Sequence, residues 1–293
     1  MEPHTVHGRL KEFEENFIYQ LCEDSDVVLF KCDYQKWRLN WTFTQKGWEM
    51  PNNIMIVPHG ARVDRRWGEK GIQKLRKELK LDKIKYLSNN IVGLIGWIQS
   101  NKRWDILTSI WEEVSREIKK RTGEDWDLLA AGTMRDEAHR EDFKQYKESL
   151  EILEKKGIAH YYEFIPRGDI YYKVIALSKF VVLPTVDETQ SGTLARIVAL
   201  KKPYITTAPL EGLTAQTLDS EGGLLFTNKK MLKEKVIRLA CDGNLRRELS
   251  KNLKNYLKKN VSWGVVTRKY RRAYRFARLK KIKGEEINFP PDF

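Results

Sequence analysis

Short apolar runs alternate with longer amphipathic segments along most of the chain. The short runs are rich in β-branched and aromatic residues and predict strands over 26–31, 54–57, 91–95, 126–130, 161–165, 180–183, 204–206 and 224–226. The amphipathic segments predict helices over 106–119, 137–155, 170–177, 192–200, 229–240 and 244–258. This alternation is typical of β-α units, so we expect a Rossmann-like α/β fold whose parallel sheet carries helices on both faces.

The pattern is interrupted between residues 58 and 90. The turn residues Pro58, His59 and Gly60 are followed by a charged, weakly periodic stretch, which we interpret as a hinge and a lead-in to the main domain. We therefore expect 1–60 to be the end or a remnant of an N-terminal domain with its hinge, 61–262 to be the main domain, and 263–293 to be a basic C-terminal helix and tail. The residues before Pro58 are too few for a second doubly wound domain, so a partner chain or a homo-oligomer is one way to supply the rest.

Length and composition are those of a globular protein. The chain has 293 residues, of which 41% are hydrophobic and 32% charged. It has no signal segment and no apolar run near the roughly 20 residues of a membrane span, so we expect it to be soluble and cytoplasmic. Cys22, Cys32 and Cys241 are too scattered for a disulfide framework, and we expect them to serve packing. We expect no metal site. Metal ligands are closely spaced in the sequence, and His59, His139 and His160 do not have this spacing to any Cys, Asp or Glu.

The formal net charge is +14, and the excess lies mainly near the C-terminus, whereas the first fifty residues are slightly acidic. Two interpretations of the basic tail are open. It approaches an anionic partner, such as a membrane surface to which the protein is peripheral, or it is the solvated face of a last helix whose apolar side carries Val265, Tyr270, Tyr274 and Phe276. Nucleic acid is the less favoured partner, since no interleaved exposed aromatics or known nucleic-acid fold is present. The basic residues are Arg268, Lys269, Arg271, Arg272, Arg275, Arg278, Lys280, Lys281 and Lys283.

The strongest candidate chemistry follows the predicted strand 180–183. A short loop leads into a helix that Ser191 can cap, and Gly192 lets the backbone approach a ligand closely. The unpaired amides and positive dipole end at such a helix start suit phosphate groups. Crevices at the carboxyl ends of parallel strands are also where open α/β sheets bind ligands. An ordinary helix start is the alternative interpretation.

Three segments stand in order along the chain: Ile54 to Ala61, Gly96 to Lys102, and Phe180 to Gly192. In this order they resemble the retaining GT-B glycosyltransferases, the family that includes glycogen and sucrose synthases. Asp26 to Phe30, which a helix follows, and the segment Ile54 to Ala61 resemble the end of the first domain of that family and its interdomain hinge, with His59 in place of the usual Asn. Gly96 with Lys102 six positions later resembles the start of its second domain, although Trp97 stands where the family often has Arg. The most telling match runs from Phe180 to Gly192 and from Ala199 to Thr207, and weaker ones are 128–132, 164–169, 222–226 and the helix that begins near Ser262 and Trp263.

The resemblance implies a nucleotide-sugar site. Glu188 would hydrogen-bond hydroxyls of the donor sugar, and Lys102 would offset charge on the leaving diphosphate, so these two are the expected catalytic residues. A loop carboxylate that caps a helix and a solvated lysine are the respective alternatives. The other residues expected to hold the donor are Gly96, Trp97, Arg167, Thr189, Gln190, Ser191, Gly192, Thr193 and Arg196.

Arg196 departs from the family pattern, which has a second Glu at this position that contacts ribose. Arginine donates hydrogen bonds and accepts none, so it cannot accept one from a ribose hydroxyl. Three alternatives follow: Arg196 binds a phosphate or another anion, ribose is recognised elsewhere, or the site has lost activity. Arg167 stands near the expected base and is a candidate for stacking on it, with a plain surface arginine as the alternative.

The function that this resemblance implies is transfer of a sugar from a nucleotide-diphosphate sugar to an acceptor, with retention and without a cofactor. The main alternative is a non-catalytic sugar-nucleotide-binding or scaffold subunit that needs a partner chain. A nucleic-acid-binding protein is the third interpretation.

Overall fold

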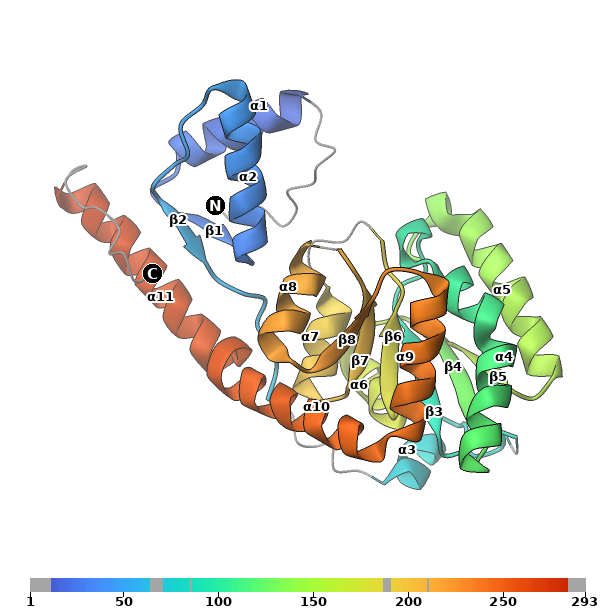
Figure 1. Cartoon of the computed structure of the whole chain (residues 1–293). Coiled ribbons are helices and arrows are strands. Elements are labelled where there is room, and N and C mark those ends of the chain that lie inside the picture. The colour runs from blue at the N-terminus through green and yellow to red at the C-terminus, as the bar shows by residue number, and fades with distance from the viewer. Residues whose placement is uncertain (1–11, 64–70, 85, 187–190, 210, 284–293) are drawn as a thin grey trace.

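The computed structural model describes residues 12–63, 71–84, 86–186, 191–209 and 211–283. Its centre is a six-stranded sheet with the order β5-β4-β3-β6-β7-β8, and every neighbouring pair is parallel. The expected α/β fold with a parallel sheet is thereby confirmed (Figure 1). Its strands are β3 (Ile91–Ile95), β4 (Asp127–Gly132), β5 (Ala159–Glu163), β6 (Phe180–Leu183), β7 (Tyr204–Thr207) and β8 (Gly223–Phe226).

Helices cover both faces of this sheet (Figure 1). One face packs its alternate strand residues against α4 (Trp104–Thr122), α5 (Arg140–Lys155) and α9 (Lys229–Cys241), with Trp111 fully buried between them. The other face packs against a second set, which is α3 (Ile72–Glu78), α6 (Gly168–Leu177), α7 (Gly192–Ala199), α8 (Glu211–Ser220) and α10 (Gly243–Tyr256). Three short helical turns complete the domain: Ser100–Lys102, Glu137–His139 and Leu257–Val261.

A smaller unit precedes this domain. It consists of α1 (Glu12–Glu23), β1 (Val28–Phe30), α2 (Asp33–Lys46) and β2 (Ile54–Ile56), and its two strands pair in parallel. Helices α1 and α2 cover one face of the pair, and the long last helix α11 (Trp263–Lys283) covers the other (Figure 1). The C-terminal helix therefore packs against strands near the opposite end of the sequence.

The expected hinge is fixed by the start of α11. Ala61 forms a parallel bridge with Ser262, and its amide donates to the Val261 carbonyl over 2.7 Å. The Trp263 ring lies so close to Gly60 that a β-carbon there would be 2.7 Å from it. A side chain at position 60 would therefore force the Trp263 ring to move.

Several sequence predictions were wrong in detail. The strand predicted over 161–165 runs from Ala159 to Glu163, because its register follows β4 and the chain then turns, with the Arg167 amide donating to the Ile165 carbonyl. Helices α1, α3 and α8 were not predicted. In α8 the buried side is largely polar, with Gln216, Thr217 and Ser220, so hydrophobic spacing gave no signal.

The prediction of which residues form the apolar side of the last helix was also partly wrong. Tyr274 is 68% exposed, whereas Val266, Ala273 and Phe276 are buried against the small sheet, with Tyr270 packed beside them. None of the helices in the described part of the chain carries an apolar stretch long enough to span a lipid bilayer.

Candidate functional site

The sheet reverses its strand order between β3 and β6. The chain proceeds from β3 outward through β4 to β5 and from β6 outward through β7 to β8. The connections on either side of this point therefore leave in opposite directions, which opens a crevice at the carboxyl ends of the two central strands. Gly96 and Trp97 follow β3 there, and Pro184 follows β6.

Two glycines bring the ends of β3 and β4 together. Gly96 has a φ of +146°, a backbone conformation that side chains disfavour, and its amide donates to the Ala131 carbonyl over 3.0 Å. A β-carbon on Gly132 would lie 1.9 Å from the Gly96 carbonyl oxygen. The two backbones are in contact, and this contact fixes the path of the chain into Trp97.

Tyr161 supports the same crossing from β5. Its hydroxyl donates to the Gly132 carbonyl over 2.9 Å. Burial raises the pKa of Tyr161, so the phenol stays protonated and remains a donor at neutral pH.

Lys102 ends the short helical turn Ser100–Lys102, in the segment that follows β3. This turn is tied to the loop after β6, since the Val186 amide donates to the Asn101 carbonyl over 2.7 Å. Lys102, Gly96, Trp97, Ser191 and Thr193 all line one pocket between the strand ends. The pocket has a volume of about 10 Å³, enough for roughly one water molecule, so a ligand of nucleotide size would lie across its mouth.

The start of α7 has the cap that the sequence predicts. Ser191 is 3% exposed, and its hydroxyl accepts a hydrogen bond of 3.3 Å from the Leu194 amide. Within the described part of the chain, the amides of Gly192 and Thr193 have no acceptor. Because the first amides of a helix point out of its N-terminal end, two donors are available beside the pocket.

Tyr171 links this helix start to β3 and was not predicted as a site residue. It is 2% exposed, and its hydroxyl lies 2.5 Å from the Thr193 hydroxyl oxygen. A β-carbon on Gly96 would be 3.3 Å from both of these oxygens. The only signal in the sequence is that a buried tyrosine needs a hydrogen-bond partner.

Arg196 turns back toward the start of its own helix. Its Nη1 donates to the Gly192 carbonyl over 2.7 Å, and its guanidinium carbon lies 4.8 Å from the centroid of the Tyr171 ring. Its Nε is buried and finds no hydrogen-bond partner among the described residues. Arg196 thus places a positive charge behind the first turn of α7.

Arg167 lies at the edge of the site. It is exposed, and its guanidinium carbon is 5.7 Å from the Trp97 ring centroid. The structure therefore gathers Gly96, Trp97, Lys102, Ser191 and Thr193 around one pocket, while Gly192 and Arg196 lie on the same helix α7 without lining it. Glu188, Thr189 and Gln190 lie outside the described residues. The ligand-binding roles of all these residues stay predictions.

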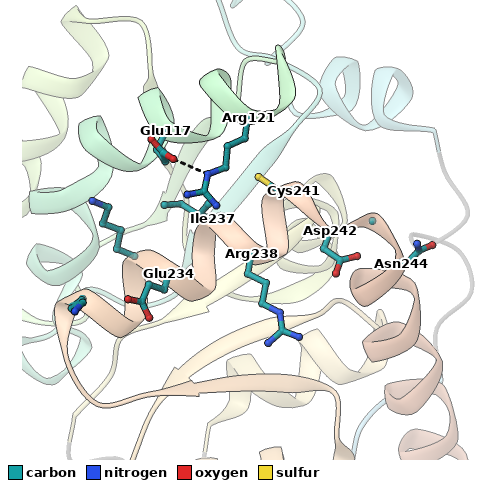
Figure 2. A pocket seen from close by; sticks show the side chains of 11 residues that line it. Glu117, Arg121, Glu234, Ile237, Arg238, Cys241, Asp242 and Asn244 are labelled. Atoms are coloured by element: carbon teal, nitrogen blue, oxygen red, sulfur yellow. Dashed lines mark hydrogen bonds and ion pairs between the residues drawn. The ribbon is translucent and has the colours of Figure 1, made fainter.

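A second pocket, of about 780 Å³, lies between α4 and α9 (Figure 2). Its charged residues have both signs: Arg121 forms an ion pair of 2.7 Å with Glu117, and Glu234 and Asp242 also line the pocket. Opposite charges at such short range leave little net attraction for an anion. Across the described residues, no cluster of His, Cys, Asp or Glu is suited to hold a metal ion.

The chain was compared with known proteins. A sequence model of the family "Glycosyl transferases group 1" matches residues 89–242. A search of curated protein sequences found no match.

Three solved structures illustrate the similarity in fold. A glycosyltransferase from Rickettsia africae has a TM-score of 0.74 at 16% identity, over 97% of this chain and 70% of the other. HepE of Anabaena in complex with UDP has a TM-score of 0.74 at 15% identity, over 94% of this chain and 71% of the other. A sucrose-phosphate synthase from Thermosynechococcus elongatus has a TM-score of 0.69 at 16% identity, over 96% of this chain and 65% of the other.

Proposed function

Because the chain belongs to the group 1 glycosyltransferases, we propose that it transfers a sugar from a nucleoside-diphosphate sugar to an acceptor with retained anomeric configuration. The observation that carries the proposal is the position of the α7 start. Its first two amides, which have no acceptor among the described residues, lie at the point where the sheet reverses its strand order, beside the pocket that Lys102 lines. Both the amides and the ammonium suit a diphosphate.

Lys102 has the chemistry that bond cleavage requires. As the bond between the sugar and the diphosphate breaks, negative charge grows on the leaving phosphate. Lys102 would lie next to that charge, because the hydrogen bond from Val186 to Asn101 holds its turn against the loop that leads to α7. Glu188 would bind hydroxyls of the donor sugar, and Thr189 and Gln190 would also contact the donor.

Trp97 and Arg167 would hold the nucleoside end of the donor. Arg167 lies over the Trp97 ring, and both offer planar groups on which a base can stack. The relative HepE has been solved with UDP and with UDP-glucose, which supports a nucleoside-diphosphate donor for this fold. Arg196 contributes charge to the phosphate end.

A titration with UDP-, GDP- and ADP-sugars tests the proposal, followed by an assay for nucleoside diphosphate release. We expect one donor to bind, and we expect Lys102→Met to lower kcat/KM for it by about 100-fold. Lys144→Met is the matched control, since Lys144 is exposed on α5 and distant in sequence from the site. Folded protein that binds none of the three donors contradicts the proposal, and binding without turnover indicates the non-catalytic subunit instead.

A further inference from the structure

The solvent-facing side of α11 is a line of arginines. Arg268, Arg271, Arg275 and Arg278 are all exposed and follow helical spacing, and Arg272 is exposed beside them. The opposite side of the helix carries the residues buried on the small sheet, Val266, Ala273 and Phe276. Arg268, Arg271, Arg275 and Arg278 therefore lie on the side that faces away from the small sheet, and we call these four residues the arginine face.

No negative charge within the helix offsets this face. The segment Trp263–Lys283 contains no Asp or Glu. Figure 1 shows α11 running along the outside of the molecule, with its C-terminal half beyond the main sheet. At about 1.5 Å per residue the arginine face extends over roughly 15 Å, so it can meet several anionic groups of one extended surface.

Exposed apolar side chains share the same side. Tyr274 is 68% exposed between Arg271 and Arg278, and Ile282 is 65% exposed one helical turn after Arg278. A nucleic-acid backbone offers phosphates but no partner for an isoleucine. The boundary between lipid headgroups and acyl chains accepts a tyrosine and an isoleucine together with arginines.

We propose that the arginine face, with Tyr274 and Ile282, docks this protein on a membrane surface rich in anionic phospholipids. Guanidinium groups pair with lipid phosphates through two parallel hydrogen bonds, and the tyrosine and isoleucine enter the headgroup boundary. Binding is peripheral and reversible, and α11 lies along the bilayer surface. The docking face is separate from the strand ends that form the candidate active site.

The test uses the full-length protein and sedimentation with lipid vesicles. One set is pure phosphatidylcholine and the other contains three parts in ten phosphatidylglycerol. We expect binding to the anionic vesicles only, weakening as salt rises. Each arginine near such a surface contributes roughly a factor of five, so Arg271→Gln, Arg275→Gln and Arg278→Gln together should lower the partition coefficient about 100-fold.

A charge-matched control is available on α10 and the turn after it. Lys251, Lys254 and Lys258 are exposed, and changing all three to Gln removes the same net charge. We expect this variant to bind vesicles nearly as the wild type does, and both variants to bind the nucleotide donor equally. Equal loss in the two triple variants overturns the proposal, because general charge and not the arginine face would then attract the vesicles.

Variants of Tyr274 and Ile282 distinguish a lipid partner from a nucleic-acid partner. Tyr274→Ser with Ile282→Ser should weaken vesicle binding about tenfold and leave binding to an RNA duplex unchanged. Equal affinity for neutral and anionic vesicles overturns the proposal. So does an affinity for the RNA duplex that exceeds vesicle binding and is lost in the triple arginine variant.

Discussion

The carbonyl oxygen of Gly96 lies so close to Gly132 that a β-carbon on Gly132 would be 1.9 Å away. The ends of β3 and β4 are therefore held in direct backbone contact, and Trp97 and the Lys102 turn continue from this crossing.

We predict that Gly132→Ala destabilises the protein by about 3 kcal/mol, because backbone atoms cannot move aside as a flexible side chain can. Gly123→Ala is the control. Gly123 has a positive φ of +71°, as Gly132 has one of +158°, but nothing lies within 4 Å of the Gly123 β-carbon position, so we expect a loss of about 1 kcal/mol. Urea unfolding measures both, and equal losses would show that the Gly96 contact is unimportant.

Tyr171 and Thr193 should be energetically coupled. The bond between their hydroxyls is partly buried, so a double-mutant cycle with Tyr171→Phe and Thr193→Val should give a coupling energy of about 1 kcal/mol. The exposed hydrogen bond from Thr133 to Glu163, at 3.3 Å, serves as the comparison and should give less than about 0.5 kcal/mol. Additive effects at Tyr171 and Thr193 would contradict the link between α6 and α7.

The sequence predicted strand bounds best where every residue of the strand is buried. β3 was predicted with its observed bounds because Ile91 to Ile95 is a continuous buried run that Gly96 follows. β6 was also predicted with its observed bounds, and it ends at Leu183, just before Pro184. The predictions overlap every strand in the described part of the chain. The bounds were poorest at β5, an edge strand that is only partly buried and so lacks a continuous apolar run.

The site was predicted only as a set of chain positions. Position 196 was identified as unusual from the sequence, but the direction of the Arg196 side chain depends on Tyr171, which belongs to another helix. Tyr171 itself was missed because a tyrosine on the apolar side of a helix is indistinguishable from ordinary core until Thr193 is placed beside it. Tertiary contacts of this kind have no signature in local spacing.

Arg196→Glu restores the acidic residue of the family pattern and should still weaken nucleotide binding. Glutamate loses the hydrogen bond to the Gly192 carbonyl and the stacking on Tyr171, and it places a negative charge behind the amides that would hold phosphate. We expect UDP, GDP or ADP, whichever binds, to bind at least about tenfold more weakly, which calorimetry measures. Arg196→Lys keeps the charge and should lose only about threefold.

Arg238→Glu controls for the charge reversal, because Arg238 is exposed in the second pocket (Figure 2). Its nucleotide affinity should match the wild type. Tighter binding by Arg196→Glu would mean that ribose, and not phosphate, is the group nearest to position 196.

Lys31 should make stability depend on pH. It follows β1 and is 5% exposed, its Nζ donates to the Tyr270 hydroxyl over 3.1 Å, and burial lowers its pKa from 10.5 to about 8. The folded protein therefore releases this proton more readily than the unfolded chain. Below about pH 8 the buried Lys31 is charged, which lowers the free energy of unfolding. This loss of stability disappears as the pH rises toward 10.5.

The comparison with Lys31→Met isolates this effect. The free energy of unfolding of the wild type should rise between pH 8 and pH 10 relative to that of the variant, as measured by urea denaturation. Lys36→Met, at an exposed position on α2, should follow the wild type across the same range. A constant difference between wild type and Lys31→Met would exclude a buried, proton-releasing lysine.

The central claim is that the start of α7 binds the diphosphate of the donor, and a crystal structure of the protein with a bound nucleoside diphosphate tests it most directly. We predict phosphate oxygens within about 3 Å of the amides of Gly192 and Thr193, with the Lys102 ammonium beside them. A diphosphate bound elsewhere, for example between α4 and α9, with those two amides paired to protein atoms, would contradict the claim.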